Sequence, residues 1–236
     1  MLETRYRIWA IGPRVGNTAT APIHVGVAGV AKSSTAQLPY VVANELICAS
    51  LAKVILLPTP PGFLIDHAGV PHFVSLNFNL AGHDLPPINP QALVQALPSF
   101  AAGVVVFDTW IANMDRHPGN LAFDAAQNKA QVFDHSHAFY AQGRPALENL
   151  TNALGIGGHC LAPHVSDVAH IKFWCERLQR VPDYYIDEVV TSAATVGLPT
   201  ADVSFCQQFL RDRRVHLYQL LEQHRNSLPS VPAGQW

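Results

Sequence analysis

Three polar side chains near the middle of the chain have the types and spacing that could hold a metal ion and orient a hydroxyl group. Asp115 and Asn120 are five positions apart, and Asp134 follows 14 positions after Asn120. Carboxylate and amide oxygens suit Mg²⁺, which leaves its other positions to water and substrate phosphates. A carboxylate kept apart from the metal can orient an attacking hydroxyl. The pattern indicates metal-assisted phosphoryl transfer.

The surrounding residues predict a β-hairpin that brings two of these side chains together. Apolar runs lie on both sides of a polar, turn-forming stretch at 124–130, which favours two antiparallel strands. Asn120 precedes the first strand and Asp134 follows the second. Because antiparallel neighbours lie about 4.7–4.9 Å apart, both residues are expected at the open end of the hairpin, where they could bind one magnesium ion.

The same residues carry a family resemblance. The interval Asp-x-x-x-x-Asn occurs in protein-kinase catalytic loops. The longer run Asn113-Met114-Asp115-Arg116-His117-Pro118-Gly119-Asn120, followed by Phe133-Asp134-His135, resembles the catalytic and metal-binding motifs of HipA-like kinases. Phosphatidylinositol-3-kinase-like enzymes share the Asp-Arg-His element. The segment 44–52 is similar to the N-lobe helix of the HipA-like group. The proline-rich segment 58–61 is similar to the stretch by which the chain leaves that helix.

This resemblance implies an α+β, two-lobed protein-kinase-like fold and a serine/threonine protein kinase that uses ATP and Mg²⁺. Asp115 would be the catalytic aspartate, and Asn120 and Asp134 would be the magnesium ligands. Glu45 would be the helix glutamate that holds a phosphate-binding lysine. Lys32, at the end of a strand-like apolar run, is the candidate lysine.

The helix expected around Glu45 supports that pairing. Glu45 is the only charged residue between Pro39 and Lys53. An unpaired charge is costly to bury, so a carboxylate in an otherwise apolar helix favours an ion pair. We therefore expect Lys32 to contact Glu45.

The elements that must position these residues divide the chain into a β-rich N-lobe, residues 1–82, and a helical C-lobe, residues 83–236, that carries the catalytic hairpin. A segment rich in Pro, Gly and Asn at 80–90 predicts a linker between them. Strands are expected at 5–11, 23–32, 63–66 and 71–78, and helices at 41–52, 91–113, 166–179, 183–196 and 202–227.

Two departures from familiar kinases leave a nucleotide-binding pseudokinase open as an alternative. The chain has no Gly-x-Gly-x-x-Gly loop, and the turn-forming segment 12–17 favours a plain hairpin turn over a phosphate-covering loop. His135-Ser136 stands where many protein kinases have Phe-Gly. The phosphate-covering loop is therefore not assigned.

Two further alternatives are a phosphoinositide kinase and a histidine–aspartate metallohydrolase. The shared Asp-Arg-His element suggests the first, but the sequence shows no evident membrane-binding helix. The second would use His117, Asp115 and the segment 134–137, but it lacks a second His/Asp pair of matching spacing. Asp108 and Asn113, at the end of an apolar helical run, are expected to brace the catalytic loop.

Composition limits the partners. The chain has 15 Lys plus Arg and 17 Asp plus Glu among 236 residues, a net charge of -2, which argues against nucleic-acid binding. The arginines at 211, 213 and 214 are expected on a solvated helix face.

No apolar run reaches the ~20 residues that span a membrane, and the N-terminus lacks a signal-peptide pattern, so we expect a cytoplasmic protein with no membrane partner.

The remaining expectations concern partners and thiols. The implied substrate is a protein with a Ser or Thr hydroxyl, and a regulatory protein partner stays open. The four cysteines are widely spaced and form no CxxC pair, which favours buried thiols over disulfides or a zinc site.

Overall fold

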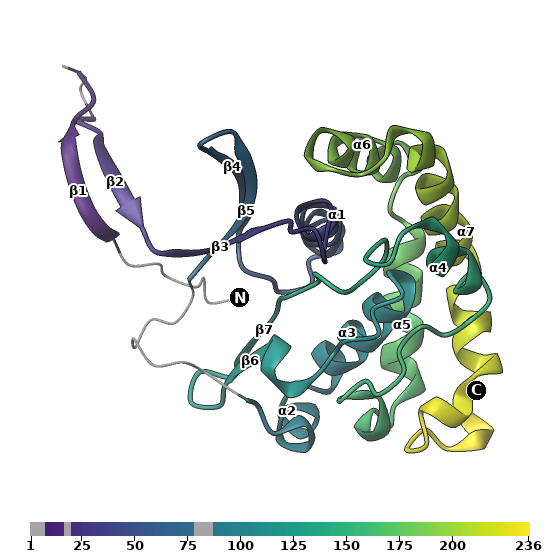
Figure 1. The fold of residues 1–236 in the computed structure, drawn as a ribbon. Coiled ribbons are helices and arrows are strands. Elements are labelled where there is room, and N and C mark those ends of the chain that lie inside the picture. Colours follow the sequence, from purple (N-terminus) through teal and green to yellow (C-terminus); the bar gives the residue numbers. More distant parts are fainter. Residues whose placement is uncertain (1–7, 17–19, 78–86) are drawn as a thin grey trace.

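The computed structural model describes residues 8–16, 20–77 and 87–236, and it shows a β-rich part followed by a larger helical part (Figure 1). This arrangement agrees with the expected α+β architecture. The lobe boundary expected at 82 and 83, most of the linker expected at 80–90 and the start of the strand expected at 5–11 lie outside the described residues. The division into domains at that position therefore stays a prediction.

The N-terminal part contains two antiparallel sheets. The three-stranded sheet has the order β3-β5-β4, with β3 at Gly29–Ser33, β4 at Gly62–His67 and β5 at Val70–Leu76. A separate ribbon, β1 (Ile8–Arg14) with β2 (Ile23–Val27), projects away from the body (Figure 1). The prediction of one strand at 23–32 is therefore wrong, because this segment forms β2 and β3, which belong to different sheets. The chain changes sheets at Gly29, where a Cβ would lie 2.7 Å from Val74 Cγ1.

Helix α1 (Val41–Val54) lies against the three-stranded sheet on one side and against helix α6 (Asp183–Ala193) on the other. Its buried residues lie all around its axis, as expected for an apolar helix between two packed layers. Tyr185 of α6 donates a hydrogen bond to the Ser50 carbonyl at 3.1 Å. The helix ends at Val54, before Pro58 as expected, and Leu56, two residues past that end, has a φ of 57°. Its position fixes where Glu45 can point.

The helix expected at 91–113 is instead two helices. Asn89 caps α2 (Pro90–Ala96) by accepting a hydrogen bond from the Ala92 amide, and α3 (Pro98–Trp110) starts at a proline. Pro98 cannot donate a backbone hydrogen bond to a preceding turn, so it favours a new helix start. No described helix is by itself long and apolar enough to cross a membrane. Only α2 and α3 together pass that test, and they meet at a 118° bend.

The remaining elements agree with most of the expected ones. The hairpin is formed by β6 (Leu121–Asp124) and β7 (Lys129–Val132). The expected helices correspond to α5 (Val168–Gln179), α6 (Asp183–Ala193) and α7 (Val203–Gln223), while the short α4 (Arg144–Asn149) was not predicted. Helix α3 is buried on all sides and packs against α5 and α7. The C-terminal end of this central helix leads directly into the loop that contains Asp115.

Close packing at Gly103 gives a test of this core. A Cβ there would lie 2.4 Å from Trp174 Cε2, and the indole is held because its Nε1 donates to the Ser99 carbonyl at 2.7 Å. Gly103→Ala should therefore destabilise the chain by about 1–3 kcal/mol, although alanine has the better helix propensity. Urea unfolding measures this. Gly157→Ala, where a Cβ meets nothing within 4 Å, is the control, and equal midpoints for both variants would contradict the packing.

Candidate active site

The open end of the β6–β7 hairpin brings Asn120 and Asp134 together. Leu121 pairs with Val132, and the Phe133 amide donates to the Asn120 carbonyl at 3.2 Å. Asp134 comes next and has a φ of 60°, an uncommon conformation for a residue other than glycine. Residues held in this way concentrate at functional sites, where their neighbours fix them. The hairpin geometry expected from the sequence is therefore present.

A buried arginine fixes both strand ends. Arg116 is 1% exposed, and its Nη1 donates to the carbonyls of Asn120 at 2.9 Å and Phe133 at 2.7 Å. Its Nε and Nη2 bind the two carboxylate oxygens of Asp108 at 2.7 and 3.0 Å. A bidentate pair of this kind fixes geometry as well as charge. Arg116 thus links the end of α3 to the end of the hairpin.

Asp108 is the centre of this brace. Asn113 donates to Asp108 at 2.9 Å, which confirms the bracing expected of these two residues. His159 Nδ1 accepts from the amides of Leu161 and Ala162, so His159 Nε2 carries the proton and donates to Asp108 at 3.1 Å. Burial would raise the pKa of the Asp108 carboxyl, but Arg116 and His159 hold it well below its ordinary value.

Asp115 is anchored through its backbone. Its amide donates to Asn113 Oδ1 at 3.1 Å, and its carbonyl accepts from Asn120 Nδ2 at 3.0 Å. Because the Asn120 amide nitrogen is used in this way, its Oδ1 is the atom that remains for a cation. The half-buried Asp115 is therefore held one hydrogen bond away from a candidate metal ligand.

Lys32 joins the N-terminal sheet to the hairpin. Its Nζ lies 2.6 Å from Glu45 Oε1, 2.7 Å from Asp134 Oδ1 and 3.1 Å from Ser136 Oγ. The expected contact between Lys32 and Glu45 is thus present, and Asp134 joins it. Two carboxylates surround one ammonium group, which leaves a net negative charge in the cluster. The chemical roles of these residues stay predictions.

The charges in this cluster support one another. Burial of the ammonium group works against its charge, but the carboxylates of Glu45 and Asp134 outweigh this effect and raise the pKa of Lys32. Burial likewise acts against the Asp134 carboxylate, yet Lys32 lowers the pKa of Asp134 below its usual value. Both groups are therefore charged at neutral pH.

Two of the arginines expected on a solvated helix face are buried instead. Arg213 donates to the carbonyls of Thr109 and Trp110 at the end of α3 and to those of Leu150, Ala153 and Leu154. Burial lowers the pKa of Arg213 to about 10. The Arg214 guanidinium binds the Val181 carbonyl and lies 2.5 Å from Asp183. The expectation was wrong because α7 packs with these residues toward unpaired carbonyls of other segments.

The thiols agree with expectation. Cys48, Cys175 and Cys206 are buried, Cys160 is half-buried, and none forms a disulfide. Burial raises the pKa of Cys160 to about 11, raises the pKa values of Cys175 and Cys206 to about 12, and raises the pKa of Cys48 well above its ordinary value. The four side chains are therefore neutral thiols.

The structure brings all five predicted site residues into two linked groups, Lys32–Glu45–Asp134 and Asp115–Asn120. Sequence reasoning gave no role to Ser136, Arg116 or His159. In residues 8–16, 20–77 and 87–236, no group of three or more His, Cys, Asp or Glu side chains could hold a metal ion. His117, weighed as a metal ligand, accepts a hydrogen bond at Nδ1 from the Gly119 amide.

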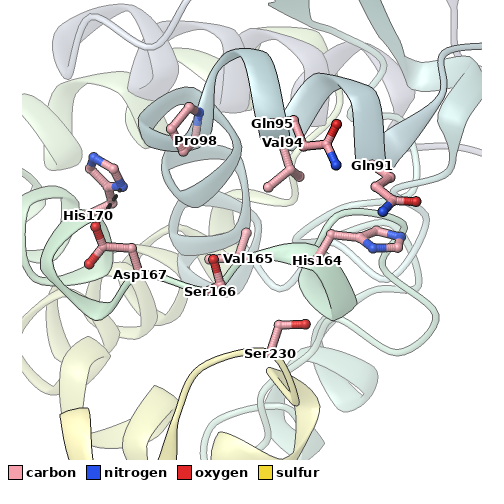
Figure 2. Close-up of a pocket in the computed structure, with 10 residues that line it drawn as sticks. All are labelled: Gln91, Val94, Gln95, Pro98, His164, Val165, Ser166, Asp167, His170 and Ser230. Atoms are coloured by element: carbon pink, nitrogen blue, oxygen red, sulfur yellow. Dashed lines mark ion pairs between the residues drawn. The ribbon is translucent and has the colours of Figure 1, made fainter.

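A separate pocket lies away from these residues. Its volume is about 400 Å³, and side chains of α2 line it together with His164, Asp167 and His170 (Figure 2). Ser166 and Ser230 also face this pocket. None of the five predicted site residues contributes to it.

Comparisons with known proteins agree with the family resemblance. The family model of HipA-like kinases matches residues 83–149, which include Asp115, Asn120 and Asp134. This match supports a kinase function, but nothing in the comparisons bears out the likeness to phosphatidylinositol-3-kinases. No curated protein matches the chain.

Similar solved structures include the following two. The proinflammatory kinase CtkA of Helicobacter pylori has a TM-score of 0.58 and 14% identity, over 82% of this chain and 90% of that chain. HipA of Shewanella oneidensis MR-1, solved with HipB and its operator DNA, has a TM-score of 0.48 and 12% identity, over 92% of this chain and 68% of that chain. The likeness to CtkA confirms the expected kinase-like fold. Residues 83–149 thus match the HipA-like kinase family, and the similarity to a kinase-like fold extends across most of the chain.

Proposed function

We propose that this chain is an ATP-dependent phosphotransferase that transfers the γ-phosphate to a Ser or Thr hydroxyl of a protein. The observation that carries the proposal is one cluster: Lys32 and Glu45 of the N-terminal part meet Asp134 at the hairpin end, beside the loop that anchors Asp115 and Asn120. A kinase needs a phosphate-binding cation, metal ligands and an acceptor-orienting carboxylate in one place. The family match over residues 83–149 supports the reaction class.

The donor set fits magnesium. Asn120 presents an amide oxygen, because its Nδ2 is bonded to the Asp115 carbonyl, and Asp134 offers a carboxylate. Asp134 already binds a cationic group, the Lys32 ammonium at 2.7 Å, which supports an affinity of this position for positive charge. Asn120 and Asp134 would hold the ion. When bound, Mg²⁺ neutralises the charge on the phosphates and fixes their orientation.

Lys32 would bind the phosphates of ATP. Its ammonium group has three N–H donors, and Glu45 holds it from a buried position on α1. Such a lysine acts as a positioned positive charge for phosphate oxygens. Glu45 itself is 2% exposed, so its function is to fix the ammonium group rather than to contact the nucleotide.

Asp115 would orient the acceptor hydroxyl. Its amide and carbonyl are both hydrogen-bonded, which fixes the backbone beside Asn120 by two contacts that do not use the half-buried carboxylate. A carboxylate that is not itself a metal ligand retains the basicity needed to accept the hydroxyl proton. The roles of Asp115 and Asp134 are therefore different.

Magnesium-dependent ATP binding is the first test. Mg·ATP at a hundred times its dissociation constant should stabilise the native chain by about 2.7 kcal/mol. For a chain of this size that corresponds to a rise in melting temperature of about 5–10 °C. Differential scanning fluorimetry measures it, with ATP plus EDTA as the comparison.

Matched variants make this result specific. Asp134→Asn should greatly reduce the rise in melting temperature. Asp124→Asn, at the opposite end of the same hairpin, should retain it, because Asp124 contacts the turn amide of Gln127. A folded parent chain with no response to millimolar Mg·ATP would refute the proposal. Labelled ATP with an acceptor protein then measures transfer to Ser or Thr.

A further inference from the structure

Ser136 lies beside the Lys32–Glu45 ion pair but has no role in the reaction proposed above. It lies two residues after Asp134 and is 9% exposed. Its hydroxyl donates a hydrogen bond to Glu45 Oε1 at 2.9 Å and accepts one from Lys32 Nζ at 3.1 Å. One hydroxyl proton and one lone pair satisfy both contacts. Ser136 thus contacts both members of the ion pair.

These contacts complete the coordination of the Lys32 ammonium group. Its three donors have three acceptors, on Glu45, Asp134 and Ser136. The two carboxylates supply the negative charge that holds the lysine, while the serine hydroxyl accepts the third N–H and so fixes the orientation of the ammonium group. Without the hydroxyl, the ammonium group would keep its charge partners and lose a fixed orientation.

The backbone around Ser136 is fixed by hydrogen bonds to side chains of α1. Its carbonyl accepts a hydrogen bond at 3.3 Å from Nδ2 of Asn44, a fully buried residue of α1. The Asn44 Oδ1 in turn accepts from the Tyr140 amide at 3.3 Å. The neighbouring His135 amide donates to Glu45 Oε1 at 3.1 Å. The segment after Asp134 is therefore attached to α1 on both sides of the Ser136 hydroxyl.

We propose that Ser136 is a positioning residue that fixes the Lys32 ammonium group for the phosphates of ATP. This inference rests on the proposed kinase function. Asp134 is also a proposed metal ligand, and a carboxylate that binds a metal ion is a weaker partner for Lys32. Glu45 and Ser136 then hold two of the three N–H donors, and the donor that Asp134 releases is available to a phosphate oxygen. The hydroxyl matters most when the site is occupied.

Three variants test this role. Ser136→Ala should weaken Mg·ATP binding and raise KM for ATP by about tenfold, the size of one hydrogen bond to a charged group, with a smaller change in kcat. Ser136→Thr, which keeps a hydroxyl, should restore both constants to near the parent values. Ser166→Ala, an exposed serine of the separate pocket (Figure 2), is the control and should change neither. Calorimetry gives the dissociation constant, and steady-state transfer assays give KM and kcat.

A double-mutant cycle separates positioning from general structural support. In a Lys32→Met background, Ser136→Ala should change the dissociation constant of Mg·ATP little, because the group it acts through is gone. An equal loss in both backgrounds would overturn the proposal. So would an equal loss in Ser136→Ala and Ser136→Thr accompanied by a lower melting temperature of the ligand-free protein.

The outcome also separates this inference from the proposed function. If the parent neither binds Mg·ATP nor transfers phosphate, the kinase proposal fails, and the role of Ser136 fails with it. If the parent binds and transfers while Ser136→Ala has the parent's KM for ATP, only the role of Ser136 fails.

Discussion

Replacing Asp115 with Asn should reduce phosphoryl transfer by about 10²–10⁴-fold while Mg·ATP binds with a dissociation constant close to that of the parent. Asparagine preserves the size of the side chain but cannot accept the hydroxyl proton. The backbone contacts of Asp115 with Asn113 and Asn120 do not depend on the carboxylate, so the metal ligands should stay in place. Initial rates with labelled ATP and one acceptor protein, together with calorimetric binding, measure both quantities.

The controls for this experiment address the alternatives as well. Asp212→Asn, an exposed residue of α7 whose carboxylate contacts Gln208, should transfer phosphate at the parent rate. Equal rates for the parent and Asp115→Asn at saturating ATP would rule out the proposed role of Asp115. A parent that binds Mg·ATP without transfer would be a pseudokinase, and one that releases phosphate without an acceptor would be a hydrolase.

The second large effect is expected on stability. Asp108→Asn should lower the free energy of unfolding by about 3–5 kcal/mol, because it leaves the buried Arg116 without its opposing charge. Both side chains are fully buried in this pair. Asparagine also cannot match the bidentate contact that the carboxylate makes. Urea unfolding at neutral pH measures the difference.

The pH dependence of that difference identifies its origin. The pKa of Asp108 is held below its ordinary value, so its stabilising contribution is complete above about pH 4 and declines as the pH falls below that value. The gap between parent and Asp108→Asn should therefore narrow in acid. Glu148→Gln, in an exposed ion pair with Arg144, should stay close to the parent throughout. A gap that is constant down to pH 2 would contradict the assigned charge effect.

Local sequence signals predicted much of the candidate site. The polar turn between two apolar runs fixes the hairpin, and the hairpin places Asn120 beside Asp134. The contact between Lys32 and Glu45 could also be anticipated, because a lone carboxylate on an otherwise apolar helix needs a partner. The break before α3 could have been recognised from Pro98, since proline favours the first turn of a helix.

Other features depend on contacts that no local pattern reveals. Ser136 forms hydrogen bonds with Lys32 and Glu45, which lie 104 and 91 positions away. His159 forms one with Asp108, which lies 51 positions away. The burial of Arg213 requires knowing which carbonyls are left unpaired at the end of α3 and after α4. Charge and periodicity alone describe an arginine on a helix as solvated, because they do not show what the helix packs against.

The contacts of Arg213 also affect the order in which a newly made chain can become organised. Its partner Thr109 lies 104 positions earlier, at the end of the helix that leads into the loop of Asp115. At a synthesis rate of about 5–20 residues per second, the arginine is added about 5–20 seconds after that helix end. A chain still attached to the ribosome therefore contains every proposed catalytic residue before it contains the guanidinium group that anchors the start of their loop. We expect that loop to be among the last parts of the protein to become ordered during translation.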